Sequence, residues 1–430
     1  MKGIMKIRNY PALFAFCLMF AVLAFAFPAL AEDDPEGIMD VQLAKDPEPL
    51  AANVESGIDH LFALLKDKNG SYDQAAIAPM LDFVLDGPAD PKDIGPARRF
   101  GGQGICLRRD VSTDLATVLH YFYNPDIPNY LLCPAVLRLS GWREGSEFLT
   151  RETKLWDDLK TLDAPVLVRG REYEVNTPDS FAEAYYRYDL DRLIILTKYR
   201  GKNVAISISE QPEKSDVGCK GAILDDSQWE YFYSGLEGLN KGLIGWMDTF
   251  TYKSASVQVF LERDAQAPQT TVFLFKWLNA GWMGANVVKR KHIYDGSLRY
   301  ARSFAKVLES ATLTPEEMAA QIKPVLHMDN ARVDAKIEEY ARNFEIRFRN
   351  DPKLKQRSYA KIIADGGYAK VLDADARRSV LALQKLKALV GMETLVDLSS
   401  SPVAEAPVPA AAPAPKPDAG QVKTEAKPES

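Results

Sequence analysis

The sequence predicts an α+β fold in which a central, curved antiparallel sheet is closed by an amphipathic helix and flanked by helical regions on both sides. Two observations lead to this prediction. Between about residues 190 and 280, apolar residues alternate with small or polar ones, which is typical of half-buried strands. Before and after that region, apolar residues recur every three or four positions, which is typical of helices packed on a core.

The chain divides by composition and periodicity into successive segments. We expect a signal peptide (1–31), a loose acidic segment (32–50), a mostly helical N-terminal region with short strands (51–145), a sheet domain with a closing helix (146–311), a C-terminal helical region (312–398) and a disordered Pro/Ala-rich tail (399–430).

The first segment has the order of an export signal. Basic residues among the first eight positions precede the apolar run 12–27, and small residues follow it up to Ala31. We therefore expect cleavage near Ala31 and a mature protein that is periplasmic or secreted. A retained membrane anchor is the alternative, because the apolar run is long for a signal core and short for a spanning helix.

Charge and composition describe an ordinary globular protein. The chain has 430 residues, 47% of them hydrophobic, and a formal net charge of -6. Proteins that bind nucleic acid usually carry a basic excess, which this chain lacks. We therefore exclude nucleic acid as a partner.

Three cysteines follow the signal, namely Cys106, Cys133 and Cys219. In an oxidising compartment one disulfide among them is expected, and Cys106 with Cys133 is the favoured pair because both flank one predicted helix. The alternative is three buried thiols that act as small hydrophobic residues. The sequence leaves both open.

The N-terminal region contains two predicted helices, 54–66 and 73–85, joined by a loop that resembles part of a calcium-binding EF-hand. Leu65 and Ala76 stand where that loop needs its first and last acidic ligands, so we expect no metal there and assign Ser71 or Asp73 as the cap of the second helix. A further helix is predicted to be capped by Ser112.

The sheet domain begins with a predicted helix over 146–162. "RLIILTKY" and "NVAISISE" then predict a hairpin, and "WEYFY", "SASVQVFLE" and "TTVFLFKWL" continue the meander. A Gly-Trp corner at 280–284 leads to an amphipathic helix over 297–310. In the C-terminal region Thr314 caps one predicted helix, and two more follow near 333–348 and 374–390.

No catalytic motif is present. The four histidines lack partners at the spacing of zinc ligands, and neither a nucleophile elbow nor a Walker loop occurs. Ser-x-x-Lys occurs at Ser303 and at Ser358 without the companion motifs of penicillin-binding enzymes. We therefore predict no catalytic, metal or cofactor residues, and no cofactor.

Aromatic residues gather in the predicted sheet. An apolar sheet face that helices leave uncovered needs a second layer or an apolar ligand, because large exposed apolar patches are rare on soluble proteins. On the closing helix, small alanines either leave room for a ligand or allow close helix packing. The predicted ligand-binding residues are Trp229, Tyr231, Phe273, Phe275, Trp277, Trp282, Ala301 and Ala305, with Trp282 at the mouth.

The stretches "QTTVFLFKWLNAGWMGANVV" and "LRYARSFAKVLE" are similar to the last strand, Gly-Trp turn and closing helix of the helix-grip fold of START-type lipid-transfer domains. This resemblance covers residues 146–310. The stretch from "KYRGKNVAISISE" to "WEYFY" resembles instead the half-barrel carriers of the LolA type. Both resemblances imply a hollow sheet that holds a lipid.

The leading hypothesis is therefore an exported, non-enzymatic protein that binds a lipid or another apolar molecule in a sheet-and-helix cavity. One alternative is a cell-envelope scaffold whose helical regions and Pro/Ala tail bind other envelope proteins. A second is a hydrolase with an unrecognised site. The sequence specifies neither the ligand nor the oligomeric state.

Overall fold

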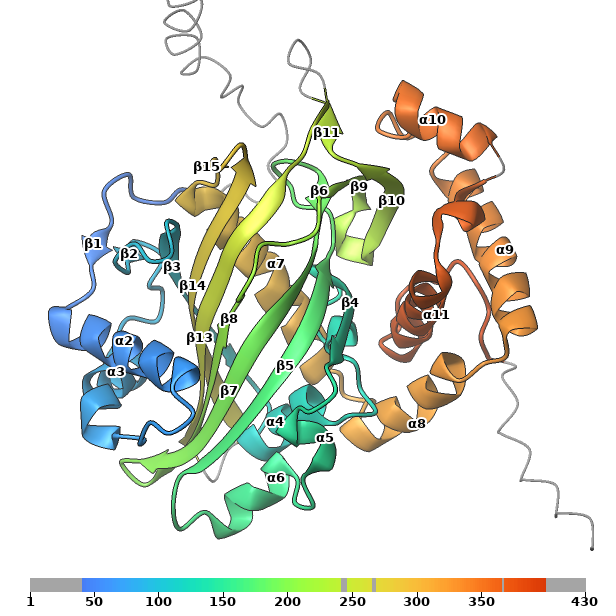
Figure 1. Cartoon of the computed structure of the whole chain (residues 1–430). Helices are drawn as coiled ribbons and strands as arrows, with labels where there is room; N and C mark the ends of the chain where they lie inside the picture. The colour runs from blue at the N-terminus through green and yellow to red at the C-terminus, as the bar shows by residue number, and fades with distance from the viewer. Residues whose placement is uncertain (1–40, 241–245, 265–267, 366, 400–430) are drawn as a thin grey trace, which may run out of the picture.

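The computed structural model of this protein describes residues 41–240, 246–264, 268–365 and 367–399. The predicted export signal and all but the first residue of the predicted tail lie outside the described residues. Within them the fold is mixed α/β and is built around one large antiparallel sheet (Figure 1).

The large sheet has eight strands in the order β15-β14-β13-β8-β7-β5-β4, with β3 added beside β14. All neighbouring strands in it are antiparallel. Their bounds are β3 (Gln103–Val111), β4 (Leu137–Trp142), β5 (Val166–Asn176), β7 (Arg187–Tyr199), β8 (Lys202–Glu210), β13 (Phe250–Asp264), β14 (Gln269–Trp282) and β15 (Ala285–Asn286).

Helices cover both faces of this sheet. On one face lie α2 (Ala52–Lys66) and α3 (Gln74–Asp86), whose apolar residues share a core with alternate residues of β7, β8, β13 and β14. On the other lie α7 (Arg290–Leu308) and α4 (Leu115–Tyr123). In Figure 1, α2 and α3 are on the left and α7 runs behind the strands. The sheet is thus the middle layer.

A second, smaller sheet has the order β10-β9-β6 and packs against the C-terminal helices (Figure 1). Its strands are β6 (Ala184–Tyr185), β9 (Cys219–Asp225) and β10 (Glu230–Glu237). The helices are α8 (Pro315–Leu326), α9 (Asn330–Arg347), α10 (Arg357–Ala364) and α11 (Ala374–Leu389). Lys387 of α11 and Glu230 of β10 form an ion pair that is almost completely buried, so the two layers are joined by charge as well as by apolar contact.

The remaining elements are short. They are β1 (Glu48–Pro49), β2 (Ile94–Gly95), β11 (Leu239–Asn240), β12 (Trp246–Met247), α5 (Glu147–Thr150), α6 (Leu155–Asp158) and the 3₁₀ turns η2 (Asn129–Leu131), η3 (Leu159–Thr161), η4 (Asp226–Gln228) and η6 (Tyr368–Val371).

Several local predictions are confirmed. The Asp73 side chain accepts hydrogen bonds from the backbone of Ala75 and Ala76, which is the predicted cap of α3. Thr314 caps α8 by accepting from the backbone N–H of Glu317. The hairpin of β7 and β8 turns at Arg200 and Gly201, which both have positive φ. Sequence patterns that involve only neighbouring residues therefore predicted these caps and this turn correctly.

Four other predictions are wrong. The helix predicted over 146–162 is broken into α5, α6 and η3. Asp114, rather than Ser112, caps α4. "WEYFY" contributes β10 to the smaller sheet instead of continuing the meander. The boundary predicted between 145 and 146 cuts through the large sheet, because β3 and β4 come from the N-terminal region.

The predicted disulfide is not formed, because Cys106, Cys133 and Cys219 are free thiols. Cys106 is buried in the core under α2 and α3, whereas Cys133 is buried in the core on the other side of the sheet. The sheet separates the favoured pair.

The Gly-Trp corner is the turn of a hairpin between β14 and β15. Trp282 pairs with Ala285, and Met283 and Gly284 between them have φ of 51° and 77°. A two-residue turn of this kind requires positive φ at both positions. At Gly281 a Cβ would lie 2.1 Å from the carbonyl oxygen of Ala285, so the close approach of the two strands requires glycine there.

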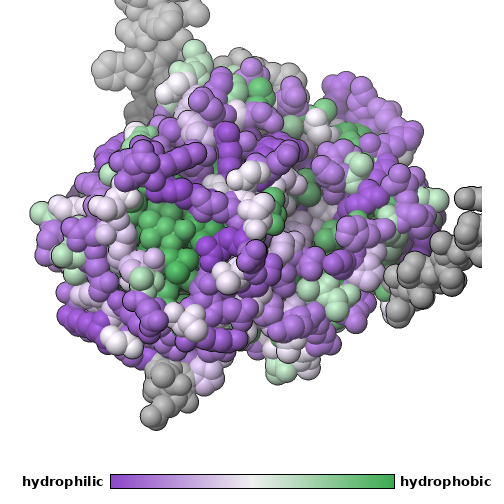
Figure 2. Space-filling model, turned by 60° about the horizontal axis from the view of Figure 1, so that its bottom comes forward, coloured by the Kyte–Doolittle hydropathy of each residue, from purple (hydrophilic) through white to green (hydrophobic). Residues whose placement is uncertain are grey.

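The face of the molecule drawn in Figure 2 is mainly hydrophilic. Turned so that the lower side of Figure 1 comes forward, it shows one hollow of hydrophobic residues surrounded by hydrophilic ones (Figure 2). Large apolar side chains that are exposed are scattered over the described part of the chain, at Leu149, Phe181, Met283 and Ile346. Most apolar residues are therefore used in the internal layers.

Candidate functional site

A cavity of about 290 Å³ lies between the large sheet and α7. Strands β5, β7, β8, β13 and β14 form one wall, and α4 and α7 contribute to the other. Its volume is close to the lower end of the range for small-molecule sites, roughly 300 to 1,000 Å³. Apolar side chains supply much of the lining, among them Phe122, Leu190, Leu274, Leu278, Val287 and Ile293.

One end of the cavity is bordered by the β14–β15 hairpin, the loop after β5 and the start of α7. Trp282, Phe181 and His292 line it there. The ring of Phe181 is stacked on that of His292, with centroids 4.0 Å apart, and 43% of Phe181 is exposed. The cavity therefore reaches the protein surface at this end.

A polar row crosses the wall formed by the sheet. The strand register places Lys276 beside Ser256, Ser256 beside Ser209, and Ser209 beside Arg192. All four line the cavity. The hydroxyls of Ser209 and Ser256 are 2.8 Å apart and bonded to each other. An otherwise apolar cavity thus has a stripe of hydroxyl and cationic groups.

Arg192 is held by carboxylates. It forms an ion pair with Glu172, lies 3.9 Å from an oxygen of Glu174, and donates to Ser207 Oγ at 2.7 Å. Tyr188 donates to the other oxygen of Glu174 at 3.0 Å. Burial raises the pKa of Glu172, and the charge of Arg192 opposes that shift. Arg192 therefore has carboxylate partners within the protein, and the cluster contains two carboxylates to one guanidinium.

Lys276 stands at the other end of the row. Its Nζ donates to Ser254 Oγ at 2.7 Å. Burial lowers the pKa of the Lys276 ammonium below its ordinary value, against the opposing influence of Glu174. Protein atoms enclose most of the Lys276 side chain, and the part that faces the cavity stays partly accessible.

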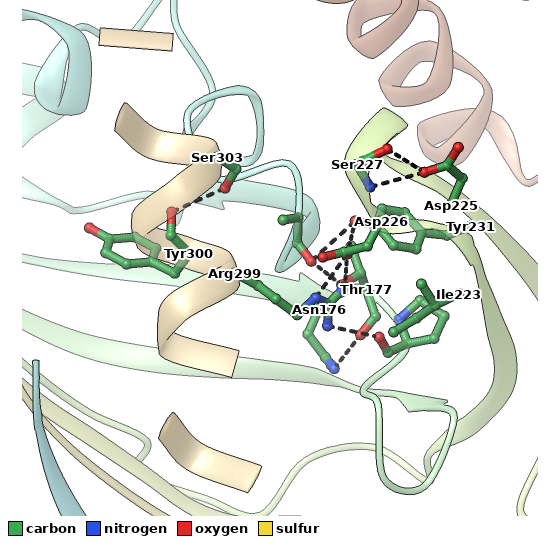
Figure 3. A network of polar contacts seen from close by, with 12 residues as sticks. Asn176, Thr177, Ile223, Asp225, Asp226, Ser227, Tyr231, Arg299, Tyr300 and Ser303 are labelled. Carbon is green, nitrogen blue, oxygen red and sulfur yellow. Dashed lines mark hydrogen bonds and ion pairs between the residues drawn. The ribbon is translucent and has the colours of Figure 1, made fainter. Parts of the chain in front are cut away.

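A buried network holds α7 in place beside the cavity (Figure 3). Arg299 of α7 forms an ion pair with Asp226 at 2.8 Å and donates to the carbonyl oxygen of Pro178 at 3.3 Å. The hydroxyl of Tyr231 donates to the same Asp226 oxygen at 2.7 Å. Gln258 of β13 also donates to the hydroxyl of Tyr300 on α7. The position of α7 is thus set by polar contacts to both sheets.

Of the predicted ligand-binding residues, Trp282 lines the cavity. Phe273, Phe275 and Trp277 lie on the opposite face of β14, in the core under α2 and α3. Trp277 meets Phe62 edge to face and donates from its indole to the carbonyl of Ala97 at 2.8 Å. The prediction chose the wrong face of β14. The alternate residues Leu274, Lys276 and Leu278 face the cavity instead.

The other four predicted residues do not line the cavity either. Trp229 and Tyr231 are buried at the smaller sheet, within the core that the C-terminal helices cover. Ala301 and Ala305 are buried where α7 packs closely on its neighbours, Ala301 beside Ile105 of β3. The two alanines are core residues, which agrees with the alternative that they allow close helix packing.

Two cavity residues that sequence reasoning missed had visible signals. Lys276 is the only charged residue between Thr270 and Leu278, a strand that is otherwise apolar or hydroxyl-bearing. Gly296 interrupts a helix without ending it. A charge inside a buried strand and a glycine inside a helix both mark positions where packing alone does not decide the residue.

Among the described residues, no group of His, Cys, Asp and Glu side chains is arranged to hold a metal ion. The loop that resembles part of an EF-hand instead uses Asp67 and Asp73 to accept backbone N–H groups. His120 is stacked on Trp156 with ring centroids 4.0 Å apart.

Comparison with known proteins adds no assignment. No family model, curated protein or solved structure matches this chain. Within the part of the chain that the structure describes, no helix has both the length and the apolar character needed to cross a membrane.

Proposed function

We propose that this protein binds a small molecule with an apolar body in the cavity between the large sheet and α7. Burial of apolar area contributes about 25 cal/mol per Å², so a hydrocarbon chain enclosed by Leu274, Leu278 and Ile293 is a sufficient source of affinity. Binding of this kind involves no reaction and is driven by the removal of apolar surface from water.

The observation that carries the proposal is Gly296. This residue lies inside α7 and lines the cavity, and a Cβ built on it meets no atom within 4 Å. Glycine inside a helix costs roughly 0.5 to 1 kcal/mol relative to alanine. A residue that weakens the helix while leaving the cavity open is expected where the open space has a use.

The architecture supports the proposal in a second way. A long amphipathic helix along one face of an antiparallel sheet, with a cavity between them, is the arrangement expected of a helix-grip domain. We propose this as the arrangement of β5, β7, β8, β13, β14 and α7. If the N-terminal 31 residues direct export, the site operates in the periplasm or outside the cell.

Gly296→Leu tests the proposal. A Cβ at position 296 meets no atom within 4 Å and Gly296 lines the cavity, so we expect a leucine side chain to occupy that space and the variant to fold, with a helix that is no weaker. Arg302→Leu is the control, because Arg302 is exposed on the same helix and does not line the cavity. Native mass spectrometry and calorimetric titration with dodecan-1-ol, a probe that is uncharged, would compare the variants with the wild type.

We expect the wild type and Arg302→Leu to bind the alcohol and any co-purified apolar ligand. We expect Gly296→Leu to bind at least about tenfold more weakly, because the space is filled. Equal binding by Gly296→Leu and the wild type, or no binding of any apolar molecule by the wild type, would show that the cavity is not the site.

A further inference from the structure

Lys276 is a cation that forms no ion pair within the described part of the chain. Its Nζ contacts the hydroxyl of Ser254. The strand neighbours on its face, Leu274 and Leu278, are apolar. Charged side chains are rarely enclosed in a protein unless they are paired or coordinate a ligand.

The acidic groups that line the same cavity have other partners. Glu174 accepts from Tyr188 and lies beside Arg192. Asp179 accepts the backbone N–H groups of Phe181 and Ala182. Arg192, the second cation of the row, is in an ion pair with Glu172, whereas Lys276 feels the charge of Glu174 without forming an ion pair with it.

We propose that the ligand ends in a carboxylate, which forms an ion pair with Lys276 while its hydrocarbon body lies along the apolar lining. This inference rests on the proposed function and specifies the chemistry of the polar end. A carboxylate carries one charge, which one ammonium balances. A phosphate monoester carries up to two charges and would need further donors. Arg192 cannot supply them while it is paired with Glu172.

The hydroxyls beside Lys276 suit a carboxylate. Ser254 lies 2.7 Å from Nζ, and Ser256 faces the cavity at the paired position on β13. A hydroxyl can donate to one carboxylate oxygen while the ammonium contacts the other. Burial lowers the pKa of the Lys276 ammonium, and a bound anion would favour the charged form.

The test compares dodecanoate with dodecan-1-ol, which has the same chain length and no charge, by calorimetry at pH 7 on the full chain. The variants are Lys276→Met, Lys276→Arg and the control Lys253→Met, because Lys253 is on the neighbouring strand and outside the lining. In the wild type and in Lys253→Met, dodecanoate should bind at least about tenfold more tightly than the alcohol.

In Lys276→Met this preference should disappear, while the affinity for the alcohol changes less than about twofold. Lys276→Arg should keep part of the preference, because it keeps the charge. Equal affinities for the two probes in the wild type would overturn the inference. A preference that survives in Lys276→Met would do the same.

The proposed function and this inference fail in different ways. If neither probe binds the wild type, the cavity is not the site and the proposed function fails. If the alcohol binds and Gly296→Leu abolishes its binding, but dodecanoate has no advantage, the inference about Lys276 fails alone. An adduct between Lys276 and dodecanal that borohydride traps, without a preference for dodecanoate, would replace the carboxylate by a carbonyl ligand.

Discussion

Arg299 of α7 and Asp226 of η4 form a buried ion pair at 2.8 Å that joins the helix beside the cavity to the smaller sheet. Arg299 is 4% exposed, and the hydroxyl of Tyr231 donates to the same carboxylate oxygen. The pair thus holds α7, which forms one wall of the cavity, through a contact that does not involve the large sheet.

Removing the charge of Asp226 should destabilise the protein strongly. Asp226→Asn leaves Arg299 buried without a counter-charge, and breaking a buried pair in this way costs about 3 to 5 kcal/mol. Asp225→Asn is the matched control, because Asp225 caps η4 and asparagine is also a good cap. Urea unfolding measures both. Equal midpoints for the two variants would contradict the role of the pair.

Lys276→Met should stabilise the empty protein while it weakens carboxylate binding. The change removes a desolvated cation, so we expect a gain of roughly 0.5 to 2 kcal/mol, in the range of known trade-offs between stability and function. Unfolding in urea without ligand measures it. A loss of stability would mean that the ammonium already has a compensating partner.

The same lysine gives a dependence on pH. Because its pKa is lowered in the folded protein, the unfolded chain binds more protons between that pKa and the ordinary value of about 10.4. The free energy of unfolding of the wild type should therefore rise with pH across this interval, relative to that of Lys276→Met. Parallel curves for the two proteins would show that the pKa is not lowered.

The two faces of β14 should respond differently to truncation. Phe275 is fully buried under α3, so Phe275→Ala should cost about 3 to 5 kcal/mol. Leu278 lines the cavity and is half-buried, so Leu278→Ala should cost less in stability and more in affinity for dodecan-1-ol. Thermal or urea unfolding, together with calorimetry, separates the two effects. A larger loss of stability in Leu278→Ala than in Phe275→Ala would contradict the assignment of the two faces of β14.

On α7, Ala301→Leu should cost roughly 1 to 3 kcal/mol from overpacking, because Ala301 is buried against Ile105, Leu107 and Leu274. Gly296→Leu, one and a half turns away, should be tolerated. Comparing the urea midpoints of these two variants tests whether the open space is confined to one side of the helix. Similar losses would mean that the cavity closes in solution.

The thiols should react according to burial. Burial raises the pKa of all three thiols, but Cys106 and Cys133 are buried whereas Cys219 is partly exposed. Alkylation of folded protein followed by peptide mass mapping should modify Cys219 first, and all three after unfolding. A peptide that links Cys106 to Cys133 would contradict their separation by the sheet.

Sequence reasoning recovered the elements that depend on neighbouring residues. Helices α2, α3, α9 and α11 were predicted from apolar spacing, and the caps Asp73 and Thr314 were predicted from side chains close to the bonds that they make. The sheet and its two main hairpins followed from period 2. Such patterns report local geometry, which does not depend on what lies opposite in the fold.

The candidate site could not be recovered in the same way. In β14 both faces are apolar, so Phe273 and Leu274 satisfy the alternation equally, and the choice depends on which face α2 and α3 cover. "WEYFY" has a strand pattern, but only its partner β9 decides the sheet to which it belongs. The open space below Gly296 results from packing between distant segments, which no single stretch encodes.

The pairing of β3 with β14 has a consequence for the order in which the molecule forms. Arg108 and Thr271 are in contact although 163 positions separate them in the chain. Contacts between segments so far apart require the closure of a long loop, which slows folding. During synthesis the β3 edge of the sheet stays unpaired until β14 has been made, and α7 follows β14 in the chain. The helical wall that α7 supplies can therefore be added to the cavity only after β14 and its Lys276 have been made.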